Sequence, residues 1–153
     1  MWKNARLAVG DYAYQDAVVE VSDVKKSDYD AIKDILVRFR ENSPAEAEKQ
    51  VSLLDRISER VTSWKIVKEN GKIVGHDHLV QDIRDSKKSR MNAIYATSDE
   101  IRNGIMNAHV KAAVDNGIEY IDNFFFGPSE KLAVPYLQYG FEISDLYAYE
   151  KTL

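Results

Sequence analysis

Apolar residues recur along the chain at two different spacings, which predict its helices and strands. From about 28 to 41 and from 44 to 61 they return every three or four residues, the spacing of one helical face. From 17 to 24 they alternate with polar residues, as in a half-buried strand. Pro44 suits the first position of the second helix. The apolar stripes are Ile32, Ile35, Leu36 and Phe39 in the first helix, and Val51, Leu54, Ile57 and Val61 in the second.

An Asn-Gly pair gives the strongest turn signal. Asn70-Gly71 separates alternating runs at 63–69 and 72–80, and both turn residues accept the positive φ that a tight hairpin requires. A charged loop follows at 82–89, and Met91–Ala96 returns as a short strand. The sequence therefore predicts a hairpin next to the centre of the fold.

The stretch from Ala93 to Gly117 is predicted to be a strand that runs into a helix. Thr97, Ser98 and Asp99 are good N-cap residues, and apolar residues then recur at helical spacing up to Asn116-Gly117. Gly104 would leave the backbone of the first turn open to close approach. Free N–H groups and the positive end of the helix dipole make such a turn a candidate anion site. The same pattern also occurs for purely structural reasons.

The remaining segments complete the predicted order. An apolar strand at 118–126 precedes a short helix from Ser129 to about Tyr139, and one or two strands follow Gly140. Residues 1–16 are expected to be an N-terminal extension that packs on the edge of the core. The order β-α-α-β-β-β-α-β-α-β predicts a single α/β (α+β) domain, residues 1–153, with a mixed sheet flanked by helices.

Composition narrows the class of protein. A net charge of −4 gives no basic footprint for nucleic acid, and the cluster at 87–90 is read as a solvated loop between Asp82 and Asp85. The chain has no cysteine, so it has neither a disulfide nor a thiol nucleophile. It has no apolar run long enough for a membrane span and no signal-like leader, so we expect a cytoplasmic protein that does not bind membranes. The oligomeric state stays open, a homodimer included.

Three short segments carry a family resemblance. They are Glu-Asn-Gly-Lys-Ile-Val-Gly at 69–75, Ser-Asp-Glu-Ile-Arg-Asn-Gly-Ile at 98–105 and Tyr-Leu-Gln-Tyr-Gly-Phe at 136–141. In this order and spacing, over residues 17–153, the chain resembles the GCN5-related N-acetyltransferase (GNAT) superfamily. The resemblance implies a mixed, mostly antiparallel central sheet flanked by helices, and an enzyme that uses acetyl-CoA as cosubstrate.

The second segment resembles the family's pyrophosphate loop, Arg/Gln-x-x-Gly-x-Gly/Ala. Gly104 matches the middle glycine, whereas Ile101 and Met106 stand at the other two positions. The resemblance implies that backbone N–H groups of this loop hold the pyrophosphate, and that residues just before it lie beside the pantetheine arm. Ser129 stands where the family often has an Asn. The cofactor-binding residues implied are Ala96, Thr97, Ser98, Arg102, Asn103, Gly104, Ile105, Met106 and Ser129.

The resemblance also implies catalytic roles. Tyr136 corresponds to the general acid that protonates the leaving thiolate, although a tyrosine packed under the last strands is an equal alternative. His76 and His78, on one face of a strand, are the candidates for the general base, with Asp77 on the other face. The two histidines could also begin a metal site, but no third ligand is evident, or they could be polar residues of a half-exposed strand. His109 lies in the middle of its predicted helix, and its side chain is expected to be packed in the core.

Two functions remain at this point. The first is an N-acetyltransferase in which a small-molecule or protein amine attacks acetyl-CoA directly, since no cysteine can form an acyl-enzyme. A backbone N–H near Tyr95 to Thr97 would polarise the carbonyl. The second is a GNAT-like binding or regulatory protein that has lost acetyl-CoA chemistry, supported by Ile101 and Met106.

Overall fold

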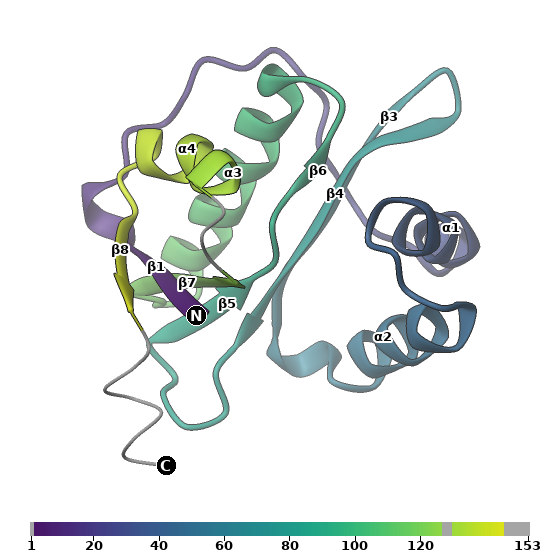
Figure 1. Ribbon diagram of the computed structural model, residues 1–153, viewed down its shortest axis with the longest axis horizontal. Coiled ribbons are helices and arrows are strands. Elements are labelled where there is room, and N and C mark those ends of the chain that lie inside the picture. Colours follow the sequence, from purple (N-terminus) through teal and green to yellow (C-terminus); the bar gives the residue numbers. More distant parts are fainter. Residues whose placement is uncertain (1, 127–129, 146–153) are drawn as a thin grey trace.

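One twisted sheet separates two layers of helices in the computed structural model, which describes residues 2–126 and 130–145 (Figure 1). Helices α1 (Tyr29–Phe39) and α2 (Pro44–Arg56) lie on one side, and α3 (Asp99–Asp115) and α4 (Glu130–Gln138) lie on the other. The strands are β1 (Trp2–Ala8), β2 (Ser22–Asp23), β3 (Val61–Glu69), β4 (Lys72–Gln81), β5 (Lys88–Met91), β6 (Tyr95–Ala96), β7 (Tyr120–Phe126) and β8 (Glu142–Asp145).

The sheet is mixed and mostly antiparallel. Its order is β2-β3-β4-β5-β7-β1-β8, and β6 pairs with β4 beyond the end of β5. The pair β5/β7 is parallel, and the other described pairs are antiparallel. This arrangement confirms the predicted fold class. No helix in the described ranges is both long and apolar enough to span a bilayer.

Several element boundaries differ from the prediction. The helix α2 begins as expected, with Ser43 as N-cap and Pro44 in its first turn, but it ends at Arg56, and Val61 is the first residue of β3. The predicted strand at 17–24 pairs with β3 at Ser22 and Asp23, and the N–H of Val24 also donates to Trp64 O on β3. The predicted strand Met91–Ala96 is divided between the end of β5 and β6. Tertiary pairing decides these boundaries where local pattern does not.

The N-terminal residues occupy an unexpected place. The strand β1 lies between β7 and β8 and pairs with both, instead of packing on the edge of the core. Ala5 and Leu7 are almost fully buried. The pattern at 1–16 was too short to indicate a strand, because only alternate residues of β1 face the core.

The sheet carries a separate apolar core on each face. The larger core packs α3 and the end of α4 against β4, β5, β7 and β1, around Leu79, Ile105 and Ile121. The smaller core packs α1 and α2 against β3 and β4, around Ile32 and Ile66. Residues that follow one another on a strand therefore contribute to different cores.

Candidate functional site

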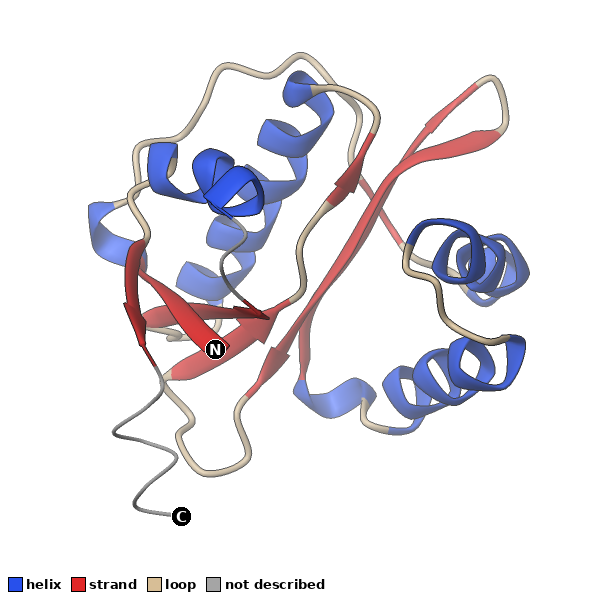
Figure 2. Cartoon of the chain, viewed as in Figure 1, coloured by secondary structure: helices blue, strands red, loops and turns tan. Residues whose placement is uncertain are grey.

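The candidate site is the place where two neighbouring strands separate. Strand β5 pairs in parallel with β7 up to Met91 and Asn123. After Met91 the chain leaves β7, and β6 pairs with β4 instead, Tyr95 opposite His76 and Ala96 opposite Gly75 (Figure 2). We call residues 92–94, between β5 and β6, the strand break. In the described pairing, β7 beyond Asn123 is bonded only to β1.

The strand break exposes backbone donors. The N–H of Thr97 donates to Val74 O on β4 (3.0 Å), whereas the N–H of Ile94 points the other way and donates to the hydroxyl of Tyr136 (2.7 Å). Because successive N–H groups of a strand point to opposite sides, the N–H of Ala96 lies on the same side as that of Ile94. Both N–H groups therefore face the space between the separating strands, and the hydroxyl of Tyr136 engages that of Ile94.

Tyr136 reaches this break from α4. Its side chain is buried, and its ring packs edge-on against Phe141 and Tyr139. Burial, followed by the nearby charge of Asp77, raises the pKa of the phenol above its ordinary value of 10. The hydroxyl is therefore protonated at neutral pH. The two alternatives for Tyr136 therefore do not exclude each other, because the same side chain is packed in the core and has its hydroxyl at the strand break.

The two predicted base candidates lie in different surroundings. The Nε2 atom of His76 accepts a hydrogen bond from the indole N–H of Trp64 (2.9 Å), and burial lowers the pKa of His76 to about 3. Burial also lowers the pKa of His78. The Nδ1 atom of His78 is buried with no hydrogen-bond partner among the described residues, and this histidine lines a cavity. Trp64 thus occupies Nε2 of His76, whereas Nδ1 of His78 is open to a ligand.

Two residues that the sequence analysis did not select lie at the same break. Arg40, at the end of α1, donates from its guanidinium to the carbonyl of Ala93. Glu41 follows with a positive φ of 55°, and both residues line a cavity of about 510 Å³ with residues 93–96. The Asn-Ser-Pro turn at 42–44, which ends α1, was the available signal, but it gave no indication of what lies opposite.

The predicted pyrophosphate loop has a different geometry. Helix α3 begins at Asp99, with the Ser98 hydroxyl accepting from Ile101 N (3.2 Å), and Arg102 N already donates to Ser98 O. The residues 103–106 therefore lie within the helix, where each N–H bonds a carbonyl four residues earlier. This corrects the assignment of Arg102, Asn103, Gly104, Ile105 and Met106 as amides that are free to hold a phosphate. The side chains of Ile105 and Met106 are fully buried.

Gly104 serves a packing role in the structure. A Cβ atom at Gly104 would lie 2.2 Å from Cγ2 of Val19, which belongs to a segment, residues 12–21, that crosses α3. We call this segment the strap. It is bonded to Asn107, which accepts from Tyr12 and from Gln15 N and donates to Gln15 O. The strap covers the surface that the prediction left open for a ligand.

We expect Gly104→Ala to loosen the strap, because the new methyl group and Val19 cannot occupy the same space. Overpacking of this kind costs about 1–3 kcal/mol. Chemical denaturation and amide hydrogen exchange would measure it, with faster exchange concentrated in residues 12–21. The variant Gly10→Ala is the control, because a Cβ there meets no atom within 4 Å. Unchanged exchange in the strap would contradict this account of Gly104.

The first turn of α3 still has some capacity for an anion. The amides of Asp99 and Glu100 have no acceptor within the helix, since the first N–H groups of a helix never do. The side chains are less suitable: Asp99 pairs with Arg102 (2.6 Å), and Glu100 accepts from Val18 N in the strap (2.9 Å). Two carboxylates against one guanidinium leave this turn negative. The site fits a thioester at the strand break better than it fits a pyrophosphate at α3.

A buried polar chain lies behind the site. His109 Nε2 is 2.9 Å from Asp77 Oδ2, and His109 Nδ1 is 2.8 Å from Ser63 Oγ. In the neutral tautomer the ring donates to the carboxylate and accepts from the hydroxyl. All three side chains are buried, so this Ser-His-Asp arrangement joins β3, β4 and α3 and cannot reach a substrate. Ser129, the last of the predicted cofactor residues, lies outside the described residues.

Comparison with known proteins was informative only at the level of structure. No family model matches the sequence, and no curated protein matches it. A GCN5-related N-acetyltransferase from Sphaerobacter thermophilus matches over 94% of this chain and 48% of its own, with a TM-score of 0.70 and 12% identity. A GNAT-family acetyltransferase from Colwellia psychrerythraea matches over 93% of this chain and 52% of its own, with a TM-score of 0.70 and 9% identity.

The chain has the GNAT fold. It spans about half the length of these two neighbours. A third, the diaminobutyrate acetyltransferase of Paenibacillus lautus in complex with L-2,4-diaminobutyric acid and coenzyme A, matches over 81% of this chain and 75% of its own, with a TM-score of 0.56 and 20% identity. At these identities the likeness concerns the GNAT fold alone. Activity has to be argued from the site.

Proposed function

We propose that this protein is an N-acetyltransferase that moves an acetyl group from acetyl-CoA to an amine of a small molecule or a protein. The observation that carries the proposal is the hydrogen bond from the N–H of Ile94 to the hydroxyl of Tyr136, a group at the strand break that keeps its proton at neutral pH. An open strand edge, the backbone N–H of Ala96 and a protonated phenol lie close together there. A backbone donor can stabilise the charge that develops in acyl transfer from a thioester, and a protonated phenol can protonate the leaving sulfur.

Each group at the break has a chemical role in the proposal. The N–H of Ala96 would stabilise negative charge on the carbonyl oxygen, which accumulates as the amine attacks, while the N–H of Ile94 holds the hydroxyl of Tyr136 at the break. The hydroxyl of Tyr136 would give its proton to the departing sulfur, and its raised pKa keeps the proton in place until then. Acetyl-CoA supplies the activated acetyl group.

The base that takes the proton of the amine is His78 in this proposal. Its lowered pKa keeps the ring neutral at physiological pH, and no described residue occupies Nδ1. His76 is less suitable because Trp64 already donates to its Nε2. Glu41 offers a carboxylate at the cavity next to the break and is the second candidate, although its side chain is exposed.

The cofactor would contact the start of α3 differently from the sequence prediction. Ala96, Thr97 and Ser98 would lie beside the pantetheine arm, and the amides of Asp99 and Glu100 with the guanidinium of Arg102 would meet the pyrophosphate. The carboxylates of the same turn oppose this contact. They favour the second function, a GNAT-like binding or regulatory protein without acetyl-CoA chemistry, more than Ile101 and Met106 do.

Calorimetric titration with acetyl-CoA decides between the two functions. We expect micromolar affinity and a rise in melting temperature, because a ligand that binds only the folded state stabilises it by mass action. Affinity should fall about tenfold in Arg102→Glu and stay unchanged in Arg38→Glu, whose side chain pairs with Asp34 on the exposed face of α1. No binding at millimolar acetyl-CoA would leave the non-catalytic function as the better account.

A further inference from the structure

A second cavity, of about 790 Å³, lies on the α2 side of the sheet. Its walls come from α2, from the end of β4 and from the loop between β4 and β5. Leu53, Leu54 and Ile57 make one wall apolar. Asn92, in the strand break, and His78, on β4, also line it, so the cavity adjoins the proposed site of acyl transfer. We call it the α2 cavity.

Positive charge predominates in the α2 cavity. Four of its lining residues are cationic, namely Arg60, Arg84, Lys88 and Arg90, and two are acidic, namely Asp82 and Asp85. Arg90 is stacked on Phe124, 3.9 Å from the ring centroid. The guanidinium groups of Arg60 and Arg84 have no acceptor within the described part of the chain. The cavity therefore holds at least two cations that are free to receive an anion.

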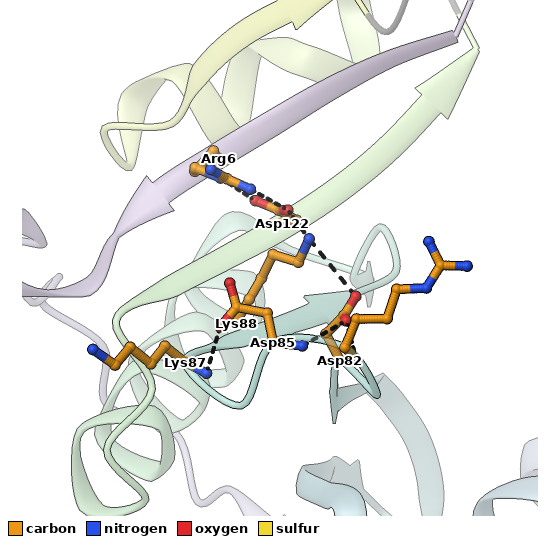
Figure 3. Close-up of polar contacts among 7 residues, drawn as sticks. Arg6, Asp82, Asp85, Lys87, Lys88 and Asp122 are labelled. Carbon is orange, nitrogen blue, oxygen red and sulfur yellow. Dashed lines mark hydrogen bonds and ion pairs between the residues drawn. The ribbon is translucent and has the colours of Figure 1, made fainter. Parts of the chain in front are cut away.

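The two carboxylates of the α2 cavity, Asp82 and Asp85, make their hydrogen bonds within the loop between β4 and β5. Asp82 accepts from the backbone N–H groups of Arg84 and Asp85, and Asp85 accepts from Lys87 N. Lys88 lies between Asp82 (3.7 Å) and Asp122 (3.8 Å), and Arg6 holds Asp122 from the other side (Figure 3). This network gives the loop its shape. Neither carboxylate of the cavity forms an ion pair with Arg60 or Arg84 in the described part of the chain, and the cations lining the cavity outnumber the acidic groups.

The α2 cavity also contains an uncharged hydrogen-bond acceptor, the ring of His78. His78 is nine-tenths buried, and its Nδ1 has no partner among the described residues. Leaving such a group buried and unpaired is costly, and a ligand that donates a hydrogen bond to it would remove that cost. An amine is such a donor. A molecule with an amine at His78 and an anionic group at Arg60 and Arg84 would satisfy both ends of the cavity.

We propose that the acceptor is a small amine that carries an anionic group, a carboxylate or a phosphate, on a partly apolar body. This inference rests on the proposed function. The amine lies toward Asn92 and the strand break, and the anionic group pairs with Arg60 and Arg84. Leu53, Leu54 and Ile57 contact the carbon chain between them. Charge and cavity shape thus select amino acids and amino phosphates over polyamines.

The test measures amine binding without any acyl donor. Matched probes are ω-amino carboxylates of four to six carbons, the corresponding aminoalkyl phosphates and the plain alkylamines. Binding is followed on protein with ¹⁵N-labelled histidine, which gives signals from only three residues, His76, His78 and His109. We expect the anionic probes to bind at least tenfold more tightly than the alkylamines, and to shift the His78 signal while His109 stays unchanged. Whichever anionic series binds more tightly shows whether the cavity prefers a carboxylate or a phosphate.

Substitution of the two arginines completes the test. In Arg60→Gln/Arg84→Gln the preference for anionic probes should fall below about threefold. Arg38→Gln/Arg56→Gln, with the same change in net charge outside the cavity, should keep it. Equal binding of alkylamines, an unchanged preference in the first double variant, or no binding of any probe would each overturn the inference. If acetyl transfer is absent while the preference persists, the proposed function fails and the anion site stands.

Discussion

Replacing Tyr136 by Phe is expected to lower kcat by about 10²–10⁴-fold, the range for loss of a positioned general acid. The ring still fits between Tyr139 and Phe141, so the fold and the affinity for acetyl-CoA should change little. The N–H of Ile94 loses its acceptor and keeps its position in the strand break. Steady-state kinetics with a saturating acceptor, together with calorimetry for acetyl-CoA, would measure the two effects separately.

Tyr139 provides the matched control for this substitution. Its hydroxyl donates to Asn103 Oδ1, away from the strand break, so Tyr139→Phe should leave kcat within about threefold of the native value. Acetyl donors whose leaving thiol has a lower pKa should restore part of the activity of Tyr136→Phe, because a better leaving group needs less protonation. Equal kcat in both variants would remove Tyr136 from the reaction.

The largest expected loss of stability comes from His109→Leu. The variant leaves Asp77 and Ser63 buried without their shared partner, and breaking a buried polar pair in this way costs about 3–5 kcal/mol. Urea denaturation would show it as a lower midpoint at an unchanged slope. The double variant Asp77→Leu/His109→Leu should lose less than the single one, because it leaves no uncompensated carboxylate. Additive losses would show that the two residues do not act as a pair.

The sequence predicted most helices and strands correctly, but beyond the hairpin it did not predict which strands lie next to each other in the sheet. Asn70-Gly71 and Pro44 are local signals, and they gave the correct hairpin and the correct helix start. The place of β1 depends on pairing with residues at the opposite end of the chain, and no local pattern contains that information. The boundary at Val61 shows the same limit, because pairing with Val80 brings this residue into the sheet.

The candidate site was partly predictable for the same reason. The alternation of His76, Asp77 and His78 gave the correct faces, and it placed the two histidines together. It could not indicate that Trp64 engages one of them and leaves the other free, since that depends on the cross-strand register. Gly104 was read as an opening for a ligand because a glycine pattern does not show what fills the space. In the structure Val19 fills it.

The position of β1 has a consequence for how the protein is made. Arg6 and Asp122 are hydrogen-bonded although 116 residues separate them, and the whole of β1 pairs with strands of similar remoteness. During synthesis β1 leaves the ribosome long before β7 and β8, and it must wait for both. Until then its two unpaired edges are open to other chains. Pairings this distant in sequence slow folding, so we expect completion of this half of the sheet to set the pace, and chaperones to matter most for nascent chains that end before β7.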